Sequence, residues 1–465
     1  MAHVVIIGGG PGGYESALVA AQLGAQVTIV DSDGIGGSAV LTDCVPSKSL
    51  IATAELMAEL SGARELGLVF EDHQGDAADH VYVDLAQINA RVKRLAADQS
   101  ADIQRTLDAA GVRVLRGRGR LAGAETVIAD LADGTSETLA ADAVLVATGA
   151  APRTMPTAEP DGERILTWEQ VYDLEERPSR LIVVGSGVTG AEFASAYLHL
   201  GVEVVLVSSR ERVLPGEDVD AAEVLEEVLR RGGMSVMDRS RMESVQRVAD
   251  GVVVTLTDGR TVTGSHCLLA VGSVPNTRGI GLEEAGVRLD AGGFVQVDRV
   301  SRTSARGVYA AGDCTGVNML ASVAAMQGRI AMWHFLGDAV APLDLRKVSA
   351  NVFTTPEIAT VGWSARALAE AEMAVETVLL PLAGNARAKM QGVRDGFVKL
   401  FARPGTGIIV GGVVVAPRAS ELIHPISIAV AQSLTVDDLA QAFTVYPSLS
   451  GSIAEAARRL HQRPQ

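Results

Sequence analysis

The sequence is poor in cysteine, in aromatic residues and in positive charge, and each shortage narrows the class of protein. Only three cysteines occur among 465 residues, and Cys44, Cys267 and Cys314 lie far apart. This spacing excludes a disulfide framework or a CxxC metal site, and we interpret Cys267 and Cys314 as small buried apolar residues. The formal net charge of −16 argues against nucleic acid or an anionic membrane as the partner.

Long apolar runs are also missing. No run reaches the roughly 18 residues needed to span a bilayer, and the opening MAHVVIIGGG has no charged leader, so we expect a cytoplasmic protein that binds no membrane. The acidic stretch at residues 71–80 holds two histidines, but nothing there sets a ligand geometry. We interpret it as a solvated loop and predict no metal site.

Glycine, in contrast, is abundant, with 49 residues, and two stretches use it in the same way. The first, HVVIIGGGPGGYESALVAAQLGAQVTIVD, predicts a strand, a glycine turn, a helix and a second strand that ends in Asp31. Gly8, Gly10 and Gly13 in that context predict a dinucleotide site, because they let a pyrophosphate approach a helix N-terminus. Asp31 can accept hydrogen bonds from a ribose.

The second stretch, RLIVVGSGVTGAEFASAYLHLGVEVVLVSSRERVL, repeats this pattern about 177 residues later. Its glycines are Gly185, Gly187 and Gly190, and the repetition predicts a second dinucleotide.

This second unit ends without an acid, in Ser208, Ser209 and Arg210. An acid would repel the 2′-phosphate of NADPH, whereas hydroxyl and guanidinium groups would accept it. We therefore predict NADPH as the preferred nucleotide, with NADH also used. The alternative is an ordinary polar loop, since Glu211 sits among these residues.

Shorter glycine-containing segments follow three other predicted strands. ADAVLVATGAAPR leads to Thr148 and Gly149, HCLLAVGSVPNT leads to Gly272, and RGVYAAGDCTG leads to Gly312 and Asp313. Asp313 precedes an apolar helix predicted from about residue 320 to 335, where it can bond a ribitol or ribose hydroxyl; a helix N-cap is the alternative. A long helix is predicted over residues 85–111, and from Lys347 strands and helices without a glycine fingerprint predict a third domain.

One cysteine stands in a reactive setting. GIGGSAVLTDCVPSKSL, residues 34–50, predicts a glycine turn that runs into a helix, with Cys44 near the helix start and four residues before Lys48. Such a setting stabilises a thiolate.

The order of these pieces resembles the flavoprotein disulfide reductases, the family of lipoamide dehydrogenase and glutathione reductase, over essentially the whole chain. The matching motifs are CVPSK at 44–48, GSGVTGAEF at 185–193, PEIATVG at 356–362, NARAK at 385–389 and GFVKL at 396–400. The resemblance implies an α/β fold with two Rossmann-like domains, for FAD (1–150 and 275–346) and NAD(P)H (151–274). It also implies an α+β dimerisation domain (347–465), and hence a homodimer.

The resemblance also implies roles for individual residues. Lys48 would lie near the flavin N5, with Glu192 as its ion-pair partner. The residues expected to contact FAD or NAD(P)H are Gly8, Gly10, Gly13, Asp31, Gly37, Ser38, Lys48, Thr148, Gly149, Gly185, Gly187, Val188, Gly190, Glu192, Ser208, Ser209, Arg210, Gly272, Gly312 and Asp313.

The thiol machinery of that family is missing. Its redox motif reads GGTCLNVGCIPSK, and Ala39 stands where the first cysteine belongs, while Cys44 matches the second, which faces the flavin. Its HPxxxE element is also lost, since Tyr446 replaces the histidine base and Gly451 the glutamate. Tyrosine, with an ordinary pKa near 10, is a poor base at neutral pH. Disulfide reduction is therefore excluded.

A quinone is the acceptor that best fits a flavin without a thiol relay. The chain resembles the branch of NAD(P)H:quinone reductases that are similar to lipoamide dehydrogenase and lack this cysteine. Tyr446 of the partner subunit would line the acceptor cavity, or would simply pack at the dimer interface. The alternatives are a soluble transhydrogenase, a peroxide or oxygen reductase that uses Cys44, and a catalytically idle flavoprotein with a binding role.

Overall fold

The computed structural model describes residues 1–68 and 81–461, so the predicted acidic loop at 71–80 lies outside the described residues. The chain divides into two compact units. Unit 1 contains residues 1–49, 89–153 and 272–344, and unit 2 contains residues 50–88, 154–271 and 345–465. Within the described ranges, no helix combines the length and apolar character needed to cross a bilayer.

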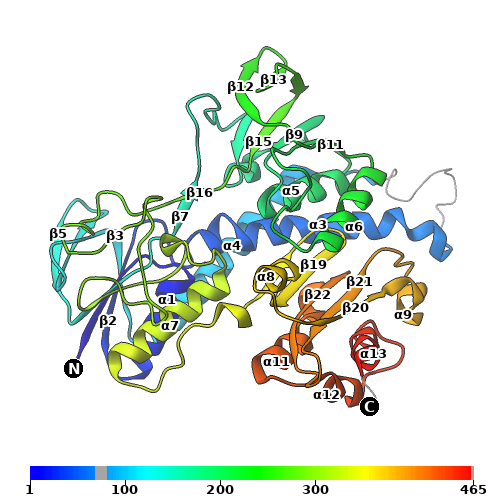
Figure 1. Cartoon of the computed structure of the whole chain (residues 1–465). Helices are drawn as coiled ribbons and strands as arrows, with labels where there is room; N and C mark the ends of the chain where they lie inside the picture. Colours follow the sequence, from blue (N-terminus) through cyan, green and yellow to red (C-terminus); the bar gives the residue numbers. More distant parts are fainter. Residues whose placement is uncertain (69–80, 462–465) are drawn as a thin grey trace. The chain divides into compact units, whose positions relative to one another are not determined.

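Unit 1 is built on a seven-stranded sheet in the order β17-β6-β1-β2-β3-β4-β5 (Figure 1). The pairs from β17 to β3 are parallel, and β4 and β5 continue the sheet antiparallel. Its elements are β1 (His3–Ile7), α1 (Pro11–Gln22), β2 (Gln26–Asp31), α2 (Gly37–Leu41), β3 (Arg113–Leu121), β4 (Thr126–Leu131), β5 (Ser136–Ala140), β6 (Ala143–Val146), β7 (Ala150–Pro152), β16 (Ser273–Pro275), β17 (Val308–Ala310) and α7 (Ala321–Leu336).

Alternate residues of β1 point to opposite faces of this sheet and are buried on both, as expected of a central parallel strand. Val4 and Ile6 pack with residues of α1 and α7 on one face, and Val5 and Ile7 pack on the other. The helices α1 and α7 lie side by side (Figure 1). They require glycine at their contact, because a Cβ on Gly328 would lie 2.3 Å from the Gly12 carbonyl oxygen.

Two helices contribute residues to both units. They are α3 (Cys44–Ser61) and α4 (Leu85–Ala109), the latter where the sequence predicts a helix over 85–111. The predicted helix around Cys44 is in fact two, since α2 ends at Leu41 and α3 begins at Cys44. Pro46 is compatible with this arrangement because proline is tolerated in the first turn of a helix.

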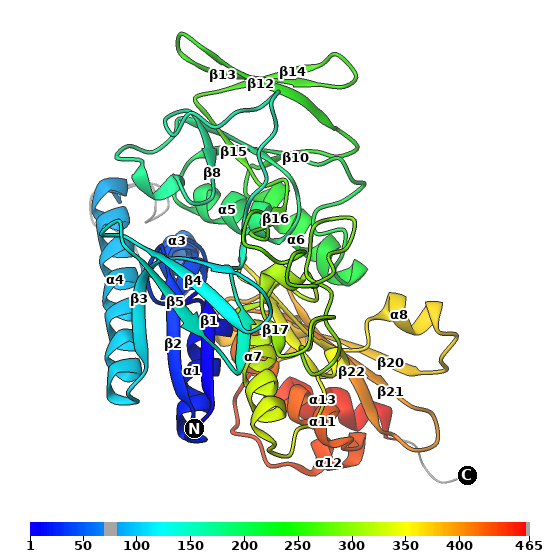
Figure 2. The same cartoon turned by 90° about the vertical axis from the view of Figure 1, so that its left-hand side faces the viewer.

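Unit 2 contains a parallel five-stranded sheet, β11-β10-β9-β15-β8, and an antiparallel three-stranded sheet, β12-β13-β14, whose long hairpins are clear in Figure 2. The two sheets share a core that includes Val205, Val254 and Cys267. The elements of this part are β8 (Ile165–Thr167), β9 (Arg180–Val184), α5 (Val188–His199), β10 (Glu203–Val207), α6 (Val219–Arg231), β11 (Ser235–Met237), β12 (Met242–Val248), β13 (Gly251–Leu256), β14 (Thr261–Gly264) and β15 (His266–Leu269).

The C-terminal part of unit 2 is an antiparallel sheet, β18-β19-β22-β21-β20, against which α11 and α13 pack. Its elements are β18 (Ser349–Val352), β19 (Glu357–Gly362), α8 (Ala365–Glu370), β20 (Glu376–Pro381), α9 (Ala386–Met390), β21 (Phe397–Ala402), β22 (Ile409–Ala416), α10 (Ala419–Leu422), α11 (His424–Gln432), α12 (Val436–Gln441) and α13 (Gly451–Leu460). The predicted α/β class is thus confirmed, whereas the bounds of the three predicted domains stay a prediction.

Candidate functional site

The first glycine loop joins β1 to α1, and each of its three predicted glycines has a distinct reason to be glycine. Gly8 has a φ of +107°, and a Cβ there would lie 2.2 Å from the Ala147 carbonyl oxygen. A Cβ on Gly13 would lie 2.0 Å from the Gly8 carbonyl oxygen. Gly10 faces open space instead, with the nearest atom 3.9 Å from its Cβ position. Two glycines therefore close the turn, and the third leaves room for a ligand.

The start of α1 is suited to an anion. Its N-cap is Gly10, which offers no side chain to the helix N–H groups. Backbone N–H groups at a helix start, with the positive end of the helix dipole behind them, bind phosphate. A diphosphate such as that of FAD fits this cradle, since the space over Gly10 lets it approach the backbone.

Asp31 closes the loop at the end of β2. Its Oδ2 accepts from the Gly9 N–H at 2.6 Å, and its Oδ1 accepts from the N–H groups of Asp33 and Gly34 at 3.0 and 2.5 Å. A carboxylate oxygen can accept two hydrogen bonds, so Oδ2 has capacity for one more donor, such as a ribose hydroxyl. The predicted ligand residue is therefore also the residue that shapes the turn.

Gly37 and Ser38 are the first residues of α2, and the start of this helix packs against the first glycine loop. Gly37 has a φ of +58°, and its Cβ would lie 2.7 Å from the Gly10 Cα. The Gly36 N–H donates to the Gly9 carbonyl at 2.8 Å. Gly37 therefore lets the two loops lie back to back. The Ser38 carbonyl accepts from the Asp43 N–H at 2.7 Å and so joins α2 to the start of α3.

Thr148, Gly149, Gly312 and Asp313 lie at the carboxyl ends of β6 and β17, which are neighbours in the same sheet. Gly149 has a φ of +66° and open space around its Cβ position. Gly312, with a φ of +84°, donates its N–H to the buried Gln327 side chain at 2.8 Å. The N-cap of the short helix after β17 is Gly312 rather than Asp313. This favours the predicted ligand role of Asp313 over a capping role.

Asp313 shares its surroundings with Asp43, a residue that we did not single out from the sequence. Burial, and then the Asp43 carboxylate, raise the pKa of Asp313 to about 6. Burial also raises the pKa of Asp43, while Lys48 lowers it. The family motif has glycine at position 43, and that departure was the signal available in the sequence.

Cys44 is the first residue of α3. It is a free thiol, and the residue is half-buried. Ala39, which lies within α2, stands where the family has its first cysteine, so no second sulfur is present at that position. The other two cysteines are fully buried, as predicted. Burial raises the pKa of the Cys314 thiol to about 11, and it raises that of Cys267 further. Neither is a nucleophile at neutral pH.

The second glycine loop, between β9 and α5, repeats the geometry of the first. A Cβ on Gly185 (φ +112°) would lie 2.1 Å from the Ala270 carbonyl oxygen, and one on Gly190 would lie 1.8 Å from the Gly185 carbonyl oxygen. Gly187, the N-cap of α5, has nothing within 4 Å of its Cβ position and offers no side-chain cap. Val188, the first residue of α5, is exposed, and Gly272 (φ +97°) follows β15. A second diphosphate fits here.

Ser208, at the end of β10, is fully buried. Its hydroxyl bonds the Ser186 hydroxyl at 2.7 Å and accepts from the Arg210 N–H at 3.1 Å. Ser209 and Arg210 are exposed. Ser208 therefore holds the turn that presents the two predicted phosphate-binding residues after it.

Glu192 is a buried carboxylate on α5. Its Oε1 accepts from the Phe353 N–H at 2.9 Å, and one turn later the Ser195 hydroxyl accepts from the Thr355 N–H at 3.2 Å. These bonds anchor α5 to the strand region that opens the C-terminal part. Glu192 belongs to unit 2 and Lys48 to unit 1, so their ion pair stays a prediction.

Tyr446 lies in the segment between α12 and α13 and is 86% exposed. Phe443 and Val445, in the same segment, are 106% and 78% exposed. Exposed apolar side chains that cluster in this way mark an interaction surface.

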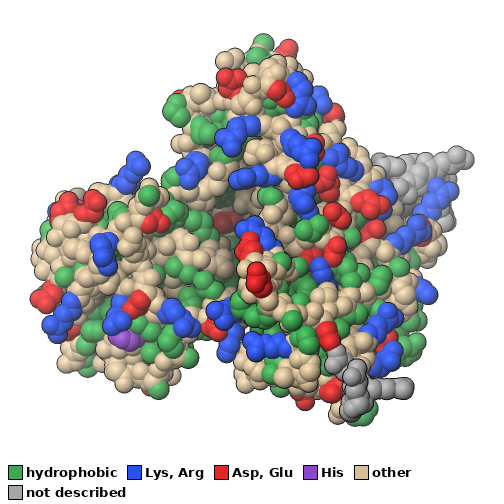
Figure 3. Space-filling model, viewed as in Figure 1, with side chains coloured by type: hydrophobic (Ala, Val, Ile, Leu, Met, Phe, Trp, Pro, Cys, Tyr) green, Lys and Arg blue, Asp and Glu red, His purple; other side chains and the backbone are tan. Residues whose placement is uncertain are grey.

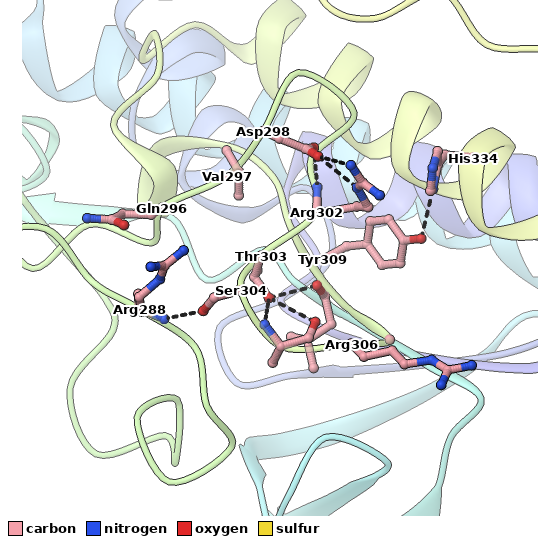
Figure 4. A pocket seen from close by; sticks show the side chains of 13 residues that line it. Arg288, Gln296, Val297, Asp298, Arg302, Thr303, Ser304, Arg306, Tyr309 and His334 are labelled. Carbon is pink, nitrogen blue, oxygen red and sulfur yellow. Dashed lines mark hydrogen bonds and ion pairs between the residues drawn. The ribbon is translucent and has the colours of Figure 1, made fainter.

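A recess of about 650 Å³ on unit 1 lies away from the glycine loops, at the amino end of β17 (Figure 4). Tyr309 lines it and bonds the His334 Nδ1 at 2.9 Å. Arg288, Arg302 and Arg306 also line it, but they point in different directions (Figure 4), and Arg302 is bound to Asp298. Ligands of such sheets bind at the opposite, carboxyl ends of the strands. We assign this recess no role.

The charged side chains outside the two glycine loops form no single-sign patch on the face drawn in Figure 3. On the face drawn in Figure 3, acidic and basic side chains are interspersed. Among residues 1–68 and 81–461, no group of three or more histidine, cysteine, aspartate or glutamate residues is placed to hold a metal ion.

Known proteins match the whole chain. The family described as "Pyridine nucleotide-disulphide oxidoreductase" matches residues 2–328, and its dimerisation domain matches residues 348–457. A Mycobacterium tuberculosis protein named NAD(P)H dehydrogenase (quinone) is 56% identical, covering 98% of this chain and 94% of its own. Dihydrolipoyl dehydrogenase of Chlorobaculum tepidum is 33% identical, covering 98% and 96%.

Solved structures agree with the fold. The crystal structure of LpdA from Mycobacterium tuberculosis has a TM-score of 0.94 and 56% sequence identity, and covers 99% of this chain and 100% of its own. An HOCl-induced flavoprotein disulfide reductase of Escherichia coli has a TM-score of 0.86 at 22% identity, covering 99% and 100%, which shows the fold alone.

Proposed function

The chain belongs to the pyridine nucleotide-disulphide oxidoreductase family, and from this we propose that it takes hydride from NADPH and passes electrons from FAD directly to a quinone. Membership makes it a pyridine-nucleotide-dependent flavoprotein oxidoreductase. The quinone, the absence of a disulfide step and the preference for NADPH are our proposals. NADH would serve as a second donor.

One observation carries the proposal: both glycine loops have a geometry that suits a dinucleotide, whereas the chain lacks the family's first cysteine. Gly10 and Gly187 each leave open space at an uncapped helix start. Ala39 removes the sulfur that would attack a disulfide substrate. Electrons would then leave the flavin directly, and the name of the Mycobacterium tuberculosis relative, NAD(P)H dehydrogenase (quinone), supports a quinone as the acceptor.

Bound FAD supplies the redox chemistry, and the chain's residues bind and orient it. We assign the diphosphate to the Gly10 turn, the adenosine ribose to Asp31 and the ribitol region to Asp313. Lys48, with Glu192, would hold a positive charge beside the flavin. Cys44 would face the flavin without a redox role.

We also propose a homodimer, as the matched dimerisation domain suggests. The exposed Phe443, Val445 and Tyr446 would be covered by the second copy, which supports assigning Tyr446 to the partner's acceptor cavity. A ring and a hydroxyl at that place would stack on a quinone and bond its oxygen. The three-domain division stays part of this proposal.

Anaerobic titration of the FAD-loaded protein tests the function. NADPH should bleach the flavin absorbance, and a naphthoquinone should restore it, whereas lipoamide and glutathione disulfide should not. No bleaching would favour an idle flavoprotein, and reduction of thio-NAD in place of the quinone would favour a transhydrogenase.

The role of Cys44 separates this proposal from sulfur chemistry. Cys44→Ser should leave quinone turnover within about two-fold, because the step would not use the thiol. Cys267→Ser, which removes a thiol buried in unit 2, is the control. Abolished turnover in Cys44→Ser alone would point to a peroxide or oxygen reductase.

A further inference from the structure

Two turns of unit 2 lie against each other at the end of β10. The turn after β10 contains Ser208 and Arg210, and the turn between β11 and β12 contains Arg239 and Ser240. The Arg239 N–H donates to the Arg210 carbonyl at 2.8 Å, and the Ser240 N–H donates to the Ser208 carbonyl at 2.7 Å. Backbone bonds therefore fix the second turn beside the predicted phosphate-binding loop.

This contact brings a third arginine, Arg239, to the turn after β10, which itself contains Arg210 and Arg212. Arg239 adopts a φ of +48°, in the left-handed region that costs a non-glycine residue free energy. Its guanidinium binds the Glu211 carboxylate at 2.8 Å, with the two side chains 71% and 66% exposed. An ion pair this exposed is weak, and a stronger anion can displace the carboxylate.

Arg212, two residues after Arg210, supplies a second indication that the turn after β10 can bind an anion. One nitrogen of its guanidinium, Nη1, is buried and has no hydrogen-bond partner among the described residues. Buried polar groups in folded proteins nearly always have a partner. In a dinucleotide-binding unit the adenosine ribose lies at the end of the second strand, which here is β10.

We propose that Arg239 is a specificity-determining residue for the 2′-phosphate of NADPH, and that Glu211 holds its guanidinium when the bound nucleotide lacks that phosphate. The phosphate takes the place of the Glu211 carboxylate on Arg239, and Arg210 and Arg212 of the turn after β10 add to the positive charge. The dianion attracts the guanidinium more strongly than one carboxylate does. This inference rests on the proposed use of NADPH.

The arrangement accounts for the use of both nucleotides. With NADH, the Glu211–Arg239 pair stays closed, and Glu211 is close enough to the loop to accept a hydrogen bond from a ribose hydroxyl. With NADPH, the pair opens and Arg239 binds the phosphate. Preference then depends on a competition between two anions for one guanidinium.

Binding of 2′,5′-ADP and of 5′-ADP to the FAD-loaded full chain, measured by calorimetry, tests this. Arg239→Gln should weaken 2′,5′-ADP about 10-fold and leave 5′-ADP within about 2-fold, since only the former carries the contacted phosphate. Glu211→Gln should tighten 2′,5′-ADP, because the competing anion is lost. Arg239→Lys should recover part of the affinity because it keeps the charge.

Arg247→Gln is the matched control, since Arg247 is also an exposed arginine of this unit, paired with Glu163 at 2.7 Å. It should change neither affinity. An Arg239→Gln protein with unchanged 2′,5′-ADP binding would overturn the inference while leaving NADPH use intact, and so would an equal loss for both ligands. Failure of the unaltered protein to bind either ligand would overturn the proposed function itself.

Discussion

The two glycine loops have nearly the same backbone but close on different side chains. Gly10 and Gly187, the two N-caps, have φ and ψ of −71° and −175°, and of −72° and −173°. In unit 1 the loop closes through Asp31, which accepts from the Gly9 N–H. In unit 2 the equivalent closure is a hydroxyl pair, Ser186 and Ser208, 2.7 Å apart.

This difference separates what binds a diphosphate from what selects the nucleotide. The glycine turn and the uncapped helix are common to both units, so under our proposal they would recognise the diphosphate that FAD and NAD(P)H share. The residue that ends the second strand differs, and it lies where the two cofactors differ in charge. An acid suits a free ribose, whereas an uncharged closure followed by arginines suits a phosphorylated one.

The largest effect on stability is expected where a glycine packs directly against a backbone carbonyl, as one does in each loop. Gly190→Ala would place a Cβ 1.8 Å from a carbonyl oxygen and should destabilise unit 2 by about 3 kcal/mol, with loss of NADPH binding. Gly187→Ala should leave the thermal midpoint unchanged, because nothing lies within 4 Å of its Cβ position, but should still lose NADPH. Calorimetric melting with nucleotide titration measures both. Equal stability of the two variants would contradict the separate roles that we assign to Gly187 and Gly190.

The next largest effect, on nucleotide preference, is expected from replacing the hydroxyl pair of unit 2 by the aspartate and glycine of unit 1. Ser186→Gly with Ser208→Asp builds the unit 1 closure into unit 2, and should move the ratio of kcat/KM for NADPH over NADH by at least about 10-fold toward NADH. The acid repels the 2′-phosphate and leaves the glycine turn intact. Ser208→Asp alone, which keeps the Ser186 side chain beside the new carboxylate, is the comparison. An unchanged ratio in the double variant would defeat the assignment of NADPH.

The smallest effect is expected on the pH dependence of stability, through the carboxyl group of Asp313 in unit 1. The raised pKa of Asp313, about 6, means that the folded chain binds this proton more tightly than the unfolded chain does. The resulting stabilisation is complete below pH 3.8 and is lost as the pH rises through 6. Asp313→Asn should remove this loss.

Thermal midpoints of the flavin-free protein, recorded as a function of pH, measure this change in stability. Between pH 4 and 7 the variant should gain about 2 °C relative to the unaltered chain, a modest shift because Asp313 is only half-buried. Asp43→Asn should reduce the shift, since it removes the neighbouring carboxylate. Parallel pH profiles for all three proteins would contradict the role of this pair.

The fingerprint residues were predictable because their requirements are local. A positive φ at Gly8 and a Cβ clash at Gly13 arise within one strand-turn-helix segment, and the same holds for Gly185 and Gly190. The helix over 85–109 was predictable for a similar reason, since its apolar spacing repeats along one segment. The role of Ser208 was less accessible, because its burial depends on Ser186, 22 residues earlier.

The sequence by itself determined the fold class, the two glycine loops and the alanine at position 39 in place of the family's first cysteine, because each follows from residue type at a fixed spacing. Tertiary structure alone decided that Asp43 faces Asp313, and that Arg239 joins Glu211 across 28 residues. The sequence positions of these charged residues follow no repeating pattern. Which of them meet depends on which turns lie side by side once the strands of a sheet are in register. The sequence therefore predicted Ser208, Ser209 and Arg210 for NADPH, whereas the pairing of Arg239 with Glu211 was visible only in the folded chain.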